Sequence, residues 1–387
     1  MTPYILAVAA ALPWIWLPIF YRRRLNHSTS LDDESVEIPA LPPMVSVIIP
    51  ARNEEHNIAE CLRSILGNIY SRFEVIVVDD QSTDRTGEIA REISGHDPRV
   101  RVVLNTALPD GWLGKPWACA TGAEHASGDI LCFTDADTLH RPDALVRSIN
   151  AMSRREADLF SIYSGQRFET RWERIIQPHV FALIALRFGG TETVTRSPRV
   201  LDKITNGQCL FATRPAYDQM GGHHAVRGYF NEDVMIAQHF FANGKRVVLT
   251  SGVNQTSTRM YTSLSEMVHG WGRTLYSGAR LSTPSFGSVS WIVHPVLSVL
   301  PLMMELAPVI VLIRAAFTGI SSPVLIWAVL STLGMLWWWH YVYAGTRHRI
   351  LYALIYPFGA TVVFYIYLRA IFRGSRVTWK GRAYVSE

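Results

Sequence analysis

This sequence of 387 residues has little cysteine and lacks the short motifs that mark several common protein classes. Its four cysteines form no Cys-x-x-Cys pair, so neither a disulfide framework nor a zinc site is indicated, and a reducing compartment is favoured. No G-x-G-x-x-G sequence follows a predicted strand and no G-x-x-x-x-G-K-[ST] sequence occurs, which argues against dinucleotide-binding and P-loop folds. Internal repeats are absent, as is a stripe of basic and aromatic residues of the kind that binds nucleic acid.

Charge is scarce in four apolar stretches, one near the start of the chain and three in its C-terminal third. They cover residues 4–20, 289–313, 323–342 and 351–371. Each is long enough to cross a membrane, the first only just. No basic residue precedes the first stretch and three arginines follow it at 22–24, so an uncleaved anchor is favoured over a signal peptide. The positive-inside rule then places these arginines, and the polar part of the chain, in the cytosol.

The polar part of the chain lies between the first apolar stretch and the other three, which predicts one folded domain held between membrane segments. The predicted parts are an anchor at 1–21, a linker at 22–43, a cytosolic domain at 44–262, an interfacial amphipathic helix at 263–287, membrane segments at 288–372 and a basic tail at 373–387. Basic clusters beside the apolar stretches fit anionic lipid head groups, so we expect a multi-pass protein of the cell (inner) membrane.

Strand and helix patterns alternate through the first part of the domain, at intervals of about 25 to 30 residues. Apolar runs predict strands at 45–50, 74–78, 100–104 and 130–134, with helices ending near 66, beginning near 86 and covering 117–126. This alternation predicts right-handed βαβ crossovers and an α/β fold with a mainly parallel sheet.

Beyond residue 142 the alternation is weaker. A strand is predicted at 208–213, followed by helices at 229–243 and 265–279. Residues 172–188 are apolar on most sides of a helix, but the proline at 178 predicts that this helix is broken. Such a segment fits either the membrane interface or the interior of the protein.

Two carboxylates directly follow the predicted strand at 130–134. Because residues two apart in an extended segment point the same way, Asp135 and Asp137 are expected to face one site, at the edge where open α/β sheets bind ligands. Two adjacent carboxylates repel each other unless a cation lies between them, and Mg²⁺ or Mn²⁺ carrying a diphosphate suits such hard oxygen ligands. A solvated turn after a strand has the same sequence pattern, so both readings are open at this point.

Four segments occur in an order and spacing typical of one enzyme family. They are residues 45–55, 77–84, 135–137 and 231–233. Together they closely resemble the family 2 glycosyltransferases, which have the GT-A fold, over about residues 45 to 280. The anchor, the three C-terminal stretches, residues 111–115 and the ending at 377–384 narrow the resemblance to a membrane-bound, lipid-acceptor branch. That branch includes hopanoid-associated, carotenoid (diaponeurosporenoate) and ceramide glycosyltransferases.

The resemblance implies a set of binding residues. The nucleotide-sugar would bind at Ala51, Glu54, Asp79, Asp80, Lys115 and Asp135, and a divalent metal, Mg²⁺ or Mn²⁺, at Asp135 and Asp137. Lys115 precedes a predicted helix, whose N-terminus also favours an anion such as the diphosphate. Plainer readings stay open, because Asp79 and Asp80 also suit a turn that caps a strand and Lys115 also suits a solvated surface.

The resemblance also implies catalytic residues. Asp233 falls where the family has its general base, with Glu232 beside it, and Arg273 falls where an arginine contacts the diphosphate. An acidic pair at a helix N-terminus is the plainer reading of 232–233. Gly207 and Gln208 are candidates for the acceptor pocket, as is the pair at 223–224, although two exposed loop histidines are the simpler interpretation of that pair.

The implied function is inverting transfer of a sugar from a UDP-sugar to a hydroxyl or carboxyl group of an amphipathic lipid, such as a hopanoid, a carotenoid or a sphingolipid-like molecule. Processive members of the family carry a Gln-x-x-Arg-Trp box, of which this chain keeps only Arg273, so processive synthesis is in doubt. The alternatives are a polysaccharide synthase of the same family and a non-catalytic membrane scaffold that binds nucleotide-sugars.

The basic tail conflicts with a simple membrane topology. Three full crossings after the cytosolic domain would place the tail outside, against the positive-inside rule. The stretch 289–313 contains three prolines together with His294 and Glu305, and a charged residue at such a depth should face protein or a cavity. We therefore predict that this stretch is bent or re-entrant and helps to form the lipid-acceptor entrance, with the tail cytosolic and close to the folded domain.

Overall fold

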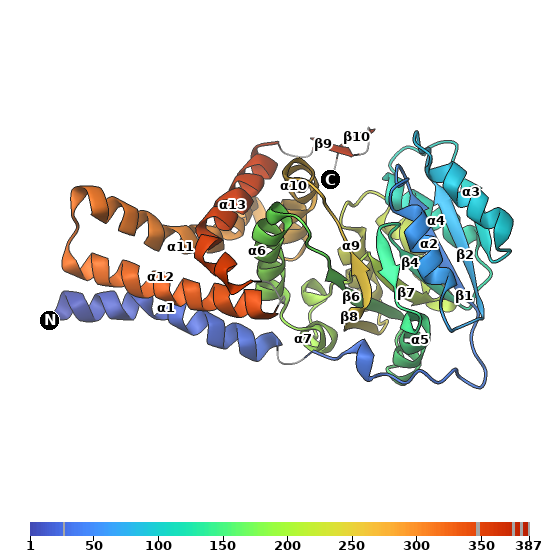
Figure 1. The fold of residues 1–387 in the computed structure, drawn as a ribbon, viewed down its shortest axis with the longest axis horizontal. Helices are drawn as coiled ribbons and strands as arrows, with labels where there is room; N and C mark the ends of the chain where they lie inside the picture. The colour runs from blue at the N-terminus through green and yellow to red at the C-terminus, as the bar shows by residue number, and fades with distance from the viewer. Residues whose placement is uncertain (26–27, 346–348, 374–375, 380–381, 386–387) are drawn as a thin grey trace. The chain divides into compact units, whose positions relative to one another are not determined.

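The computed structural model describes residues 1–25, 28–345, 349–373, 376–379 and 382–385 (Figure 1). The chain divides into two compact units. The α/β unit contains residues 28–167, 191–260 and 375–387, and the helical unit contains residues 1–27, 168–190 and 261–374. Each unit is therefore built from segments that are far apart in the sequence.

The α/β unit is built on an eight-stranded sheet with the order β3-β2-β1-β4-β7-β6-β8-β5. The strands are β1 (Val45–Ala51), β2 (Phe73–Asp79), β3 (Val100–Leu104), β4 (Ile130–Thr134), β5 (Thr138–His140), β6 (Leu159–Gln166), β7 (Cys209–Thr213) and β8 (Val247–Thr258). Strands β1 to β4 pair in parallel, as the alternation predicts. Beyond β4 the sheet is mixed, because β7 runs antiparallel to both β4 and β6 while β6 and β8 are parallel. The carboxyl ends of β1, β2 and β4 therefore meet at one edge.

Helices cover both faces of this sheet. They are α2 (Ile58–Leu66), α3 (Thr86–His96), α4 (Gly114–His125), α5 (Ala144–Arg154), α7 (Thr191–Arg196), α8 (Arg214–Gln219) and α9 (Glu232–Ala242). On β1 the side chains alternate, so that Val47 packs into the core containing Leu62 of α2 and Ile48 into the core containing Phe240 of α9. Each such fully buried side chain contributes about 1.5 to 3 kcal/mol, which holds the strand ends in fixed positions.

The end of the chain belongs to the α/β unit and forms a two-stranded antiparallel sheet. Its strands are β9 (Arg376–Trp379) and β10 (Arg382–Val385), with Arg382 opposite Trp379. The five short 3₁₀ segments are η1 (Leu31–Asp33), η2 (Val200–Asp202), η3 (Gly222–Val226), η4 (Gly287–Val289) and η5 (Ile350–Ile355) within the described residues. The predicted basic tail thus contains regular structure.

The helical unit packs around a core of aromatic side chains. Its helices are α1 (Thr2–Leu25), α6 (Arg171–Phe188), α10 (Leu264–Leu281), α11 (Ser290–Thr318), α12 (Ser322–Gly345) and α13 (Tyr356–Arg373). The core includes Trp338 and Trp339 of α12 with Tyr21 of α1 and Tyr356 of α13. Within the described residues, four helices are long and apolar enough to cross a membrane: Thr2–Leu25, Gly287–Thr318, Ser322–Gly345 and Ile350–Arg373.

One prediction about prolines is wrong, and a second is wrong in one of its two forms. Helix α6 continues through Pro178, and it starts at a capping box in which Thr170 and Glu173 satisfy each other's backbone N–H groups. Helix α11 continues from Ser290 to Thr318 with three prolines inside it, so the stretch 289–313 contains no re-entrant turn, and the bend that was the other form of that prediction stays a prediction. A proline removes one backbone hydrogen bond, which the many packing contacts of a long apolar helix outweigh.

Candidate functional site

The loops after β1 and β2 are locked together by hydrogen bonds. The N–H of Asp80 donates to the carbonyl of Ala51 at 2.8 Å. The guanidinium of Arg52 donates to the carbonyls of Asp80 (2.6 Å) and Gln81 (2.9 Å). Glu54 is held through its own N–H, which donates to Thr86 Oγ1 at 2.7 Å. Four residues predicted to bind the nucleotide, Ala51, Glu54, Asp79 and Asp80, therefore belong to one rigid corner of the sheet.

The two neighbouring carboxylates of this corner have different surroundings. Asp79 Oδ1 accepts a hydrogen bond at 3.0 Å from the N–H of Ser82, three residues on, which closes the turn after β2. Its Oδ2 lies so close to Gly87 that a Cβ there would be 2.3 Å away. Asp80 is only 2% exposed, and its carboxylate contacts the guanidinium of Arg382. The contacts of Asp79 are those of the turn reading, whereas the carboxylate of Asp80 is paired with a guanidinium; both nucleotide-binding roles stay predictions.

A second group of predicted residues gathers around Lys115 in the first turn of α4. Its Nζ lies 2.7 Å from Asp135 Oδ1 and 3.0 Å from Glu232 Oε1. Burial lowers the pKa of Lys115, but the carboxylates of Asp135 and Glu232 outweigh it and hold the pKa well above its usual value. Lys115 is therefore a cation whose two partners come from the end of β4 and the start of α9.

Asp233, beside Glu232 in the first turn of α9, has an unusual carboxyl group. Its Oδ2 accepts a hydrogen bond from the N–H of Gly207 at 3.2 Å, and its Oδ1 accepts one from the N–H of Val234 at 2.9 Å. Burial and the carboxylate of Glu232 raise the pKa of Asp233 to about 7, against the opposing effect of Lys115. A carboxyl group with a pKa near neutrality is suited to accept a proton at physiological pH.

The loop at 205–208 completes this cluster. A Cβ on Gly207 would lie 3.0 Å from Lys115 Nζ and 3.4 Å from Glu232 Oε1. The Thr205 hydroxyl donates to the carbonyl of Asp233 at 2.6 Å, and the carbonyl of Gln208 accepts from the Thr134 hydroxyl at 2.8 Å. Gly207 and Gln208 were candidates for the acceptor pocket, but Thr205 was not predicted because no motif marks it.

Other predicted residues lie outside this cluster. His223 is buried and pairs through Nδ1 with the Tyr217 hydroxyl at 2.9 Å, so the prediction that both residues of the pair 223–224 are exposed is wrong for His223. Packing against Phe133 and the bond to Tyr217 shield His223 from water, and this burial lowers its pKa to about 3 and leaves it neutral. Arg273 lies on α10 of the helical unit, and its catalytic role stays a prediction.

Asp135 and Asp137 lie in the short connection between β4 and β5. Among the residues that the structure describes, no group of three or more His, Cys, Asp and Glu side chains is arranged to hold a metal ion. Two carboxylates nevertheless fit a divalent ion that takes its other ligands from a diphosphate and from water, which is the usual arrangement for Mg²⁺. The donor set thus fits a metal that arrives with its substrate.

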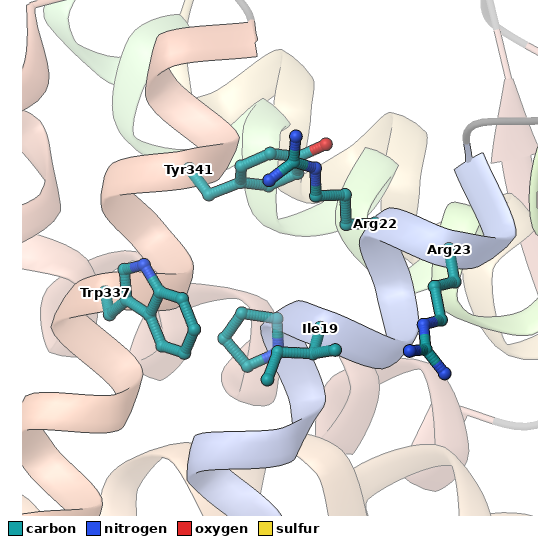
Figure 2. A pocket seen from close by; sticks show the side chains of 6 residues that line it. Ile19, Arg22, Arg23, Trp337 and Tyr341 are labelled. Carbon is teal, nitrogen blue, oxygen red and sulfur yellow. The ribbon is translucent and has the colours of Figure 1, made fainter.

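The helical unit contains a separate cavity of about 340 Å³ (Figure 2). It is lined by Pro18, Ile19, Arg22, Arg23, Trp337 and Tyr341. All six side chains come from α1 and α12, and none of them is a predicted site residue. This cavity is therefore distinct from the cluster around Lys115.

Comparison with known proteins identifies a family model and several relatives that this chain matches in sequence. Residues 46–214 match the family model described as Glycosyl transferase family 2. A 4,4'-diaponeurosporenoate glycosyltransferase of Staphylococcus haemolyticus is 31% identical over 246 residues, which are 62% of this chain and 63% of that protein. The protein of the same name from Staphylococcus aureus is 30% identical over 277 residues, covering 68% of this chain and 69% of that protein. The chain thus spans slightly less than two thirds of the first relative and slightly more of the second.

A solved structure resembles this chain in fold over most of its length. It is the mannosyltransferase PcManGT from Pyrobaculum calidifontis in complex with GDP-Man and Mn²⁺, with a TM-score of 0.54 and 18% sequence identity. The alignment covers 92% of this chain and 98% of that one. At this level of identity the likeness concerns the fold, and it confirms the expected sheet architecture.

Proposed function

Because the chain belongs to glycosyltransferase family 2 and has the GT-A fold, we propose that it transfers a sugar from a UDP-sugar to an amphipathic lipid, at the cytoplasmic face of a membrane. The observation that carries this proposal is the cluster of Lys115, Asp135, Glu232 and Asp233, at the sheet edge where open α/β folds bind ligands. The four apolar helices support a lipid acceptor, as do the two staphylococcal relatives, which are named as glycosyltransferases of the carotenoid diaponeurosporenoate.

In this reaction Asp233 accepts the proton of the acceptor hydroxyl. The hydroxyl oxygen forms a bond to the anomeric carbon while the bond from that carbon to the diphosphate oxygen breaks, so a single displacement inverts the configuration. The diphosphate leaves with the electron pair of the broken bond. The general base must lie within about 3 Å of the proton, and the hydrogen bonds from Gly207 and Val234 fix the carboxylate for that purpose.

Lys115 and the two aspartates after β4 handle the leaving group. Asp135 and Asp137 would hold Mg²⁺ or Mn²⁺, which supplies Lewis-acid stabilisation of the departing diphosphate. Lys115 brings a positive charge to the same place at the N-terminus of α4. The Mn²⁺ in the complex of the Pyrobaculum mannosyltransferase supports the choice of metal. Arg273 is proposed to contact the diphosphate as well.

The test uses membranes that contain the full-length protein, a labelled UDP-sugar and extracted lipids analysed by mass for an added hexose. Asp135→Ala and Asp137→Ala should abolish transfer, and Asp233→Asn should reduce it on the order of 10²-fold or more. Chelation of divalent ions should stop the reaction, and Mn²⁺ or Mg²⁺ should restore it. Asp218→Asn is a matched control, because that carboxylate is 60% exposed and lies in α8.

The outcomes separate the alternatives. Full turnover by Asp233→Asn would contradict the assignment of the base. Long products on a gel would identify a polysaccharide synthase, and UDP-sugar binding without transfer or hydrolysis would identify a scaffold. Transfer of one hexose to a lipid is the result that supports the proposal.

A further inference from the structure

The end of the chain supplies a charged side chain to the predicted nucleotide corner. Arg382 Nη1 lies 2.5 Å from Asp80 Oδ2, and Nη2 lies 3.4 Å from Oδ1, although the two residues are 302 positions apart. Both residues belong to the α/β unit. The side chain of Arg382 is only 14% exposed and that of Asp80 only 3% exposed. This ion pair is therefore largely shielded from water.

The rest of Asp80 is already committed to other groups. Its N–H donates to the carbonyl of Ala51, and its own carbonyl accepts from Arg52. Within the described part of the chain, Arg382 is the side chain that contacts the Asp80 carboxylate. A buried carboxylate without a counter-charge is strongly unfavourable, so Asp80 needs either this arginine or another donor in its place.

The same contact changes the interpretation of the basic tail. The sequence indicated that the basic residues near the chain end face lipid head groups, which requires them to be exposed. Arg382 is instead turned onto a carboxylate within the α/β unit. A guanidinium is a planar fork that matches a carboxylate and a phosphate equally well, and it keeps its charge at any physiological pH.

We propose that Arg382 is a donor-site residue, which neutralises Asp80 in the empty site and binds the diphosphate when the nucleotide-sugar enters. This inference rests on the proposed function. The N–H or O–H groups of the nucleoside replace the guanidinium at Asp80, and the phosphates replace Asp80 at Arg382. Through this exchange the carboxylate of Asp80 keeps hydrogen-bond donors and the guanidinium of Arg382 keeps an anionic partner, so neither buried group is left without a hydrogen-bond partner.

The experiment compares the binding of two ligands to full-length protein in lipid nanodiscs by calorimetry: UDP, which has the diphosphate, and uridine, which lacks it. Arg382→Gln should weaken UDP binding about tenfold or more without weakening uridine binding, because uridine offers Arg382 no phosphate in exchange for Asp80. Arg382→Lys, which keeps the charge but loses the fork, should fall between the two. Arg196→Gln is the control, because Arg196 also pairs with a carboxylate, that of Glu192, but is 80% exposed.

Two outcomes would overturn the proposal. Unchanged UDP affinity with a lower melting temperature would mean that the pair only holds the hairpin in place. Tighter binding of both UDP and uridine by Arg382→Gln would mean that Arg382 merely blocks the site. If Arg382→Gln does not fold, the binding of UDP and uridine by Arg382→Lys still tests the proposal. A wild-type protein that binds UDP through Arg382 but transfers no sugar would contradict the proposed function and leave the role of Arg382 standing.

Discussion

Asp233 is surrounded by groups that change its pKa in opposite directions. Burial and the Glu232 carboxylate raise the pKa, whereas Lys115 and the N–H groups of Val234 and Gly207 lower it, and the balance is about 7. Below that pH the carboxyl group is protonated and cannot accept a proton from the acceptor. The strength of this base therefore depends on the ion pairs of Lys115.

We expect transfer to a hydroxyl acceptor to rise with pH and to reach half of its maximum near pH 7, because only the ionised Asp233 can act as the base. The measurement is kcat/KM for the acceptor between about pH 5.5 and pH 8.5. A rate that stays flat across pH 7 with a hydroxyl acceptor would contradict the role of Asp233.

A carboxyl acceptor provides the control for this measurement. It is ionised throughout the range and needs no general base, so its transfer should lack the rise near pH 7. The two profiles together would show which kind of group the enzyme accepts.

Site residues were predictable where a polar side chain directly follows an apolar strand. Asp135 and Asp80 follow β4 and β2, so their place at the sheet edge could be derived from the strand pattern alone. The burial of His223 could not, because it depends on the Tyr217 hydroxyl and on packing against Phe133. Nor does any local pattern mark Thr205, which acts through a backbone carbonyl.

Three elements meet at Gly207. The first turns of α4 and α9 carry Lys115 and Asp233, and the loop that leads into β7 passes between them without a side chain. A Cβ at this position would be 3.0 Å from Lys115 Nζ, closer than the lysine tolerates in its present place. The end of the Lys115 side chain is flexible and can move away from such a Cβ. A side chain at position 207 should therefore disturb the ion pairs of Lys115 more than it disturbs the fold.

Gly207→Ala should therefore lower turnover about tenfold, through displacement of Lys115 from its carboxylates, and change the free energy of unfolding by less than about 1 kcal/mol. Steady-state kinetics and thermal unfolding check the two parts. Gly95→Ala in α3 is the matched control, because nothing lies within 4 Å of its Cβ position. Loss of the fold with Gly207→Ala, or full activity, would show that the glycine does not serve the cluster.

Helices and strands were predictable from the sequence where the local pattern of apolar and turn residues is regular. The strand at 100–104 has the predicted bounds, and α3 starts at the predicted residue, because apolar alternation and turn residues mark them clearly. Strands β6 and β8 were not predicted. The second half of β8 is rich in polar residues, and its pairing with β6 shifts register after Ser164, so neither shows a clear two-residue period. Long-range pairing in the sheet, rather than local sequence, determines them.

At the scale of the whole molecule, the contact between Asp80 and Arg382 limits the membrane topology. The two residues touch, so they lie on the same side of any membrane. Three candidate spans lie between them in the sequence, namely those of α11, α12 and α13. An odd number of crossings would separate Arg382 from Asp80, so these three helices cannot all cross.

The dimensions of the helices indicate which one stays on the near side. At 1.5 Å per residue, α11 and α12 are about 43 and 36 Å long, whereas α13 alone is about 27 Å long and reaches the length of a membrane span only together with η5. Within the helical unit, α13 runs across the direction of α1 and α12 and lies beside α6 and α10 (Figure 1). Arg373 at its end donates to the carbonyl of Gly272 on α10. We expect α11 and α12 to cross as a hairpin and α13 to lie at the cytosolic interface.

This topology can be tested by cysteine labelling in sealed, right-side-out cells with a reagent that does not cross membranes. Ser321→Cys, in the exposed connection between α11 and α12, should react, whereas Ser386→Cys, which lies beyond the described residues, should react only after the cells are opened. The four native cysteines are buried, which keeps the background low. Labelling of position 386 in intact cells would place the tail outside, and it would then be incompatible with the contact between Arg382 and Asp80 as well as with a cytosolic donor site.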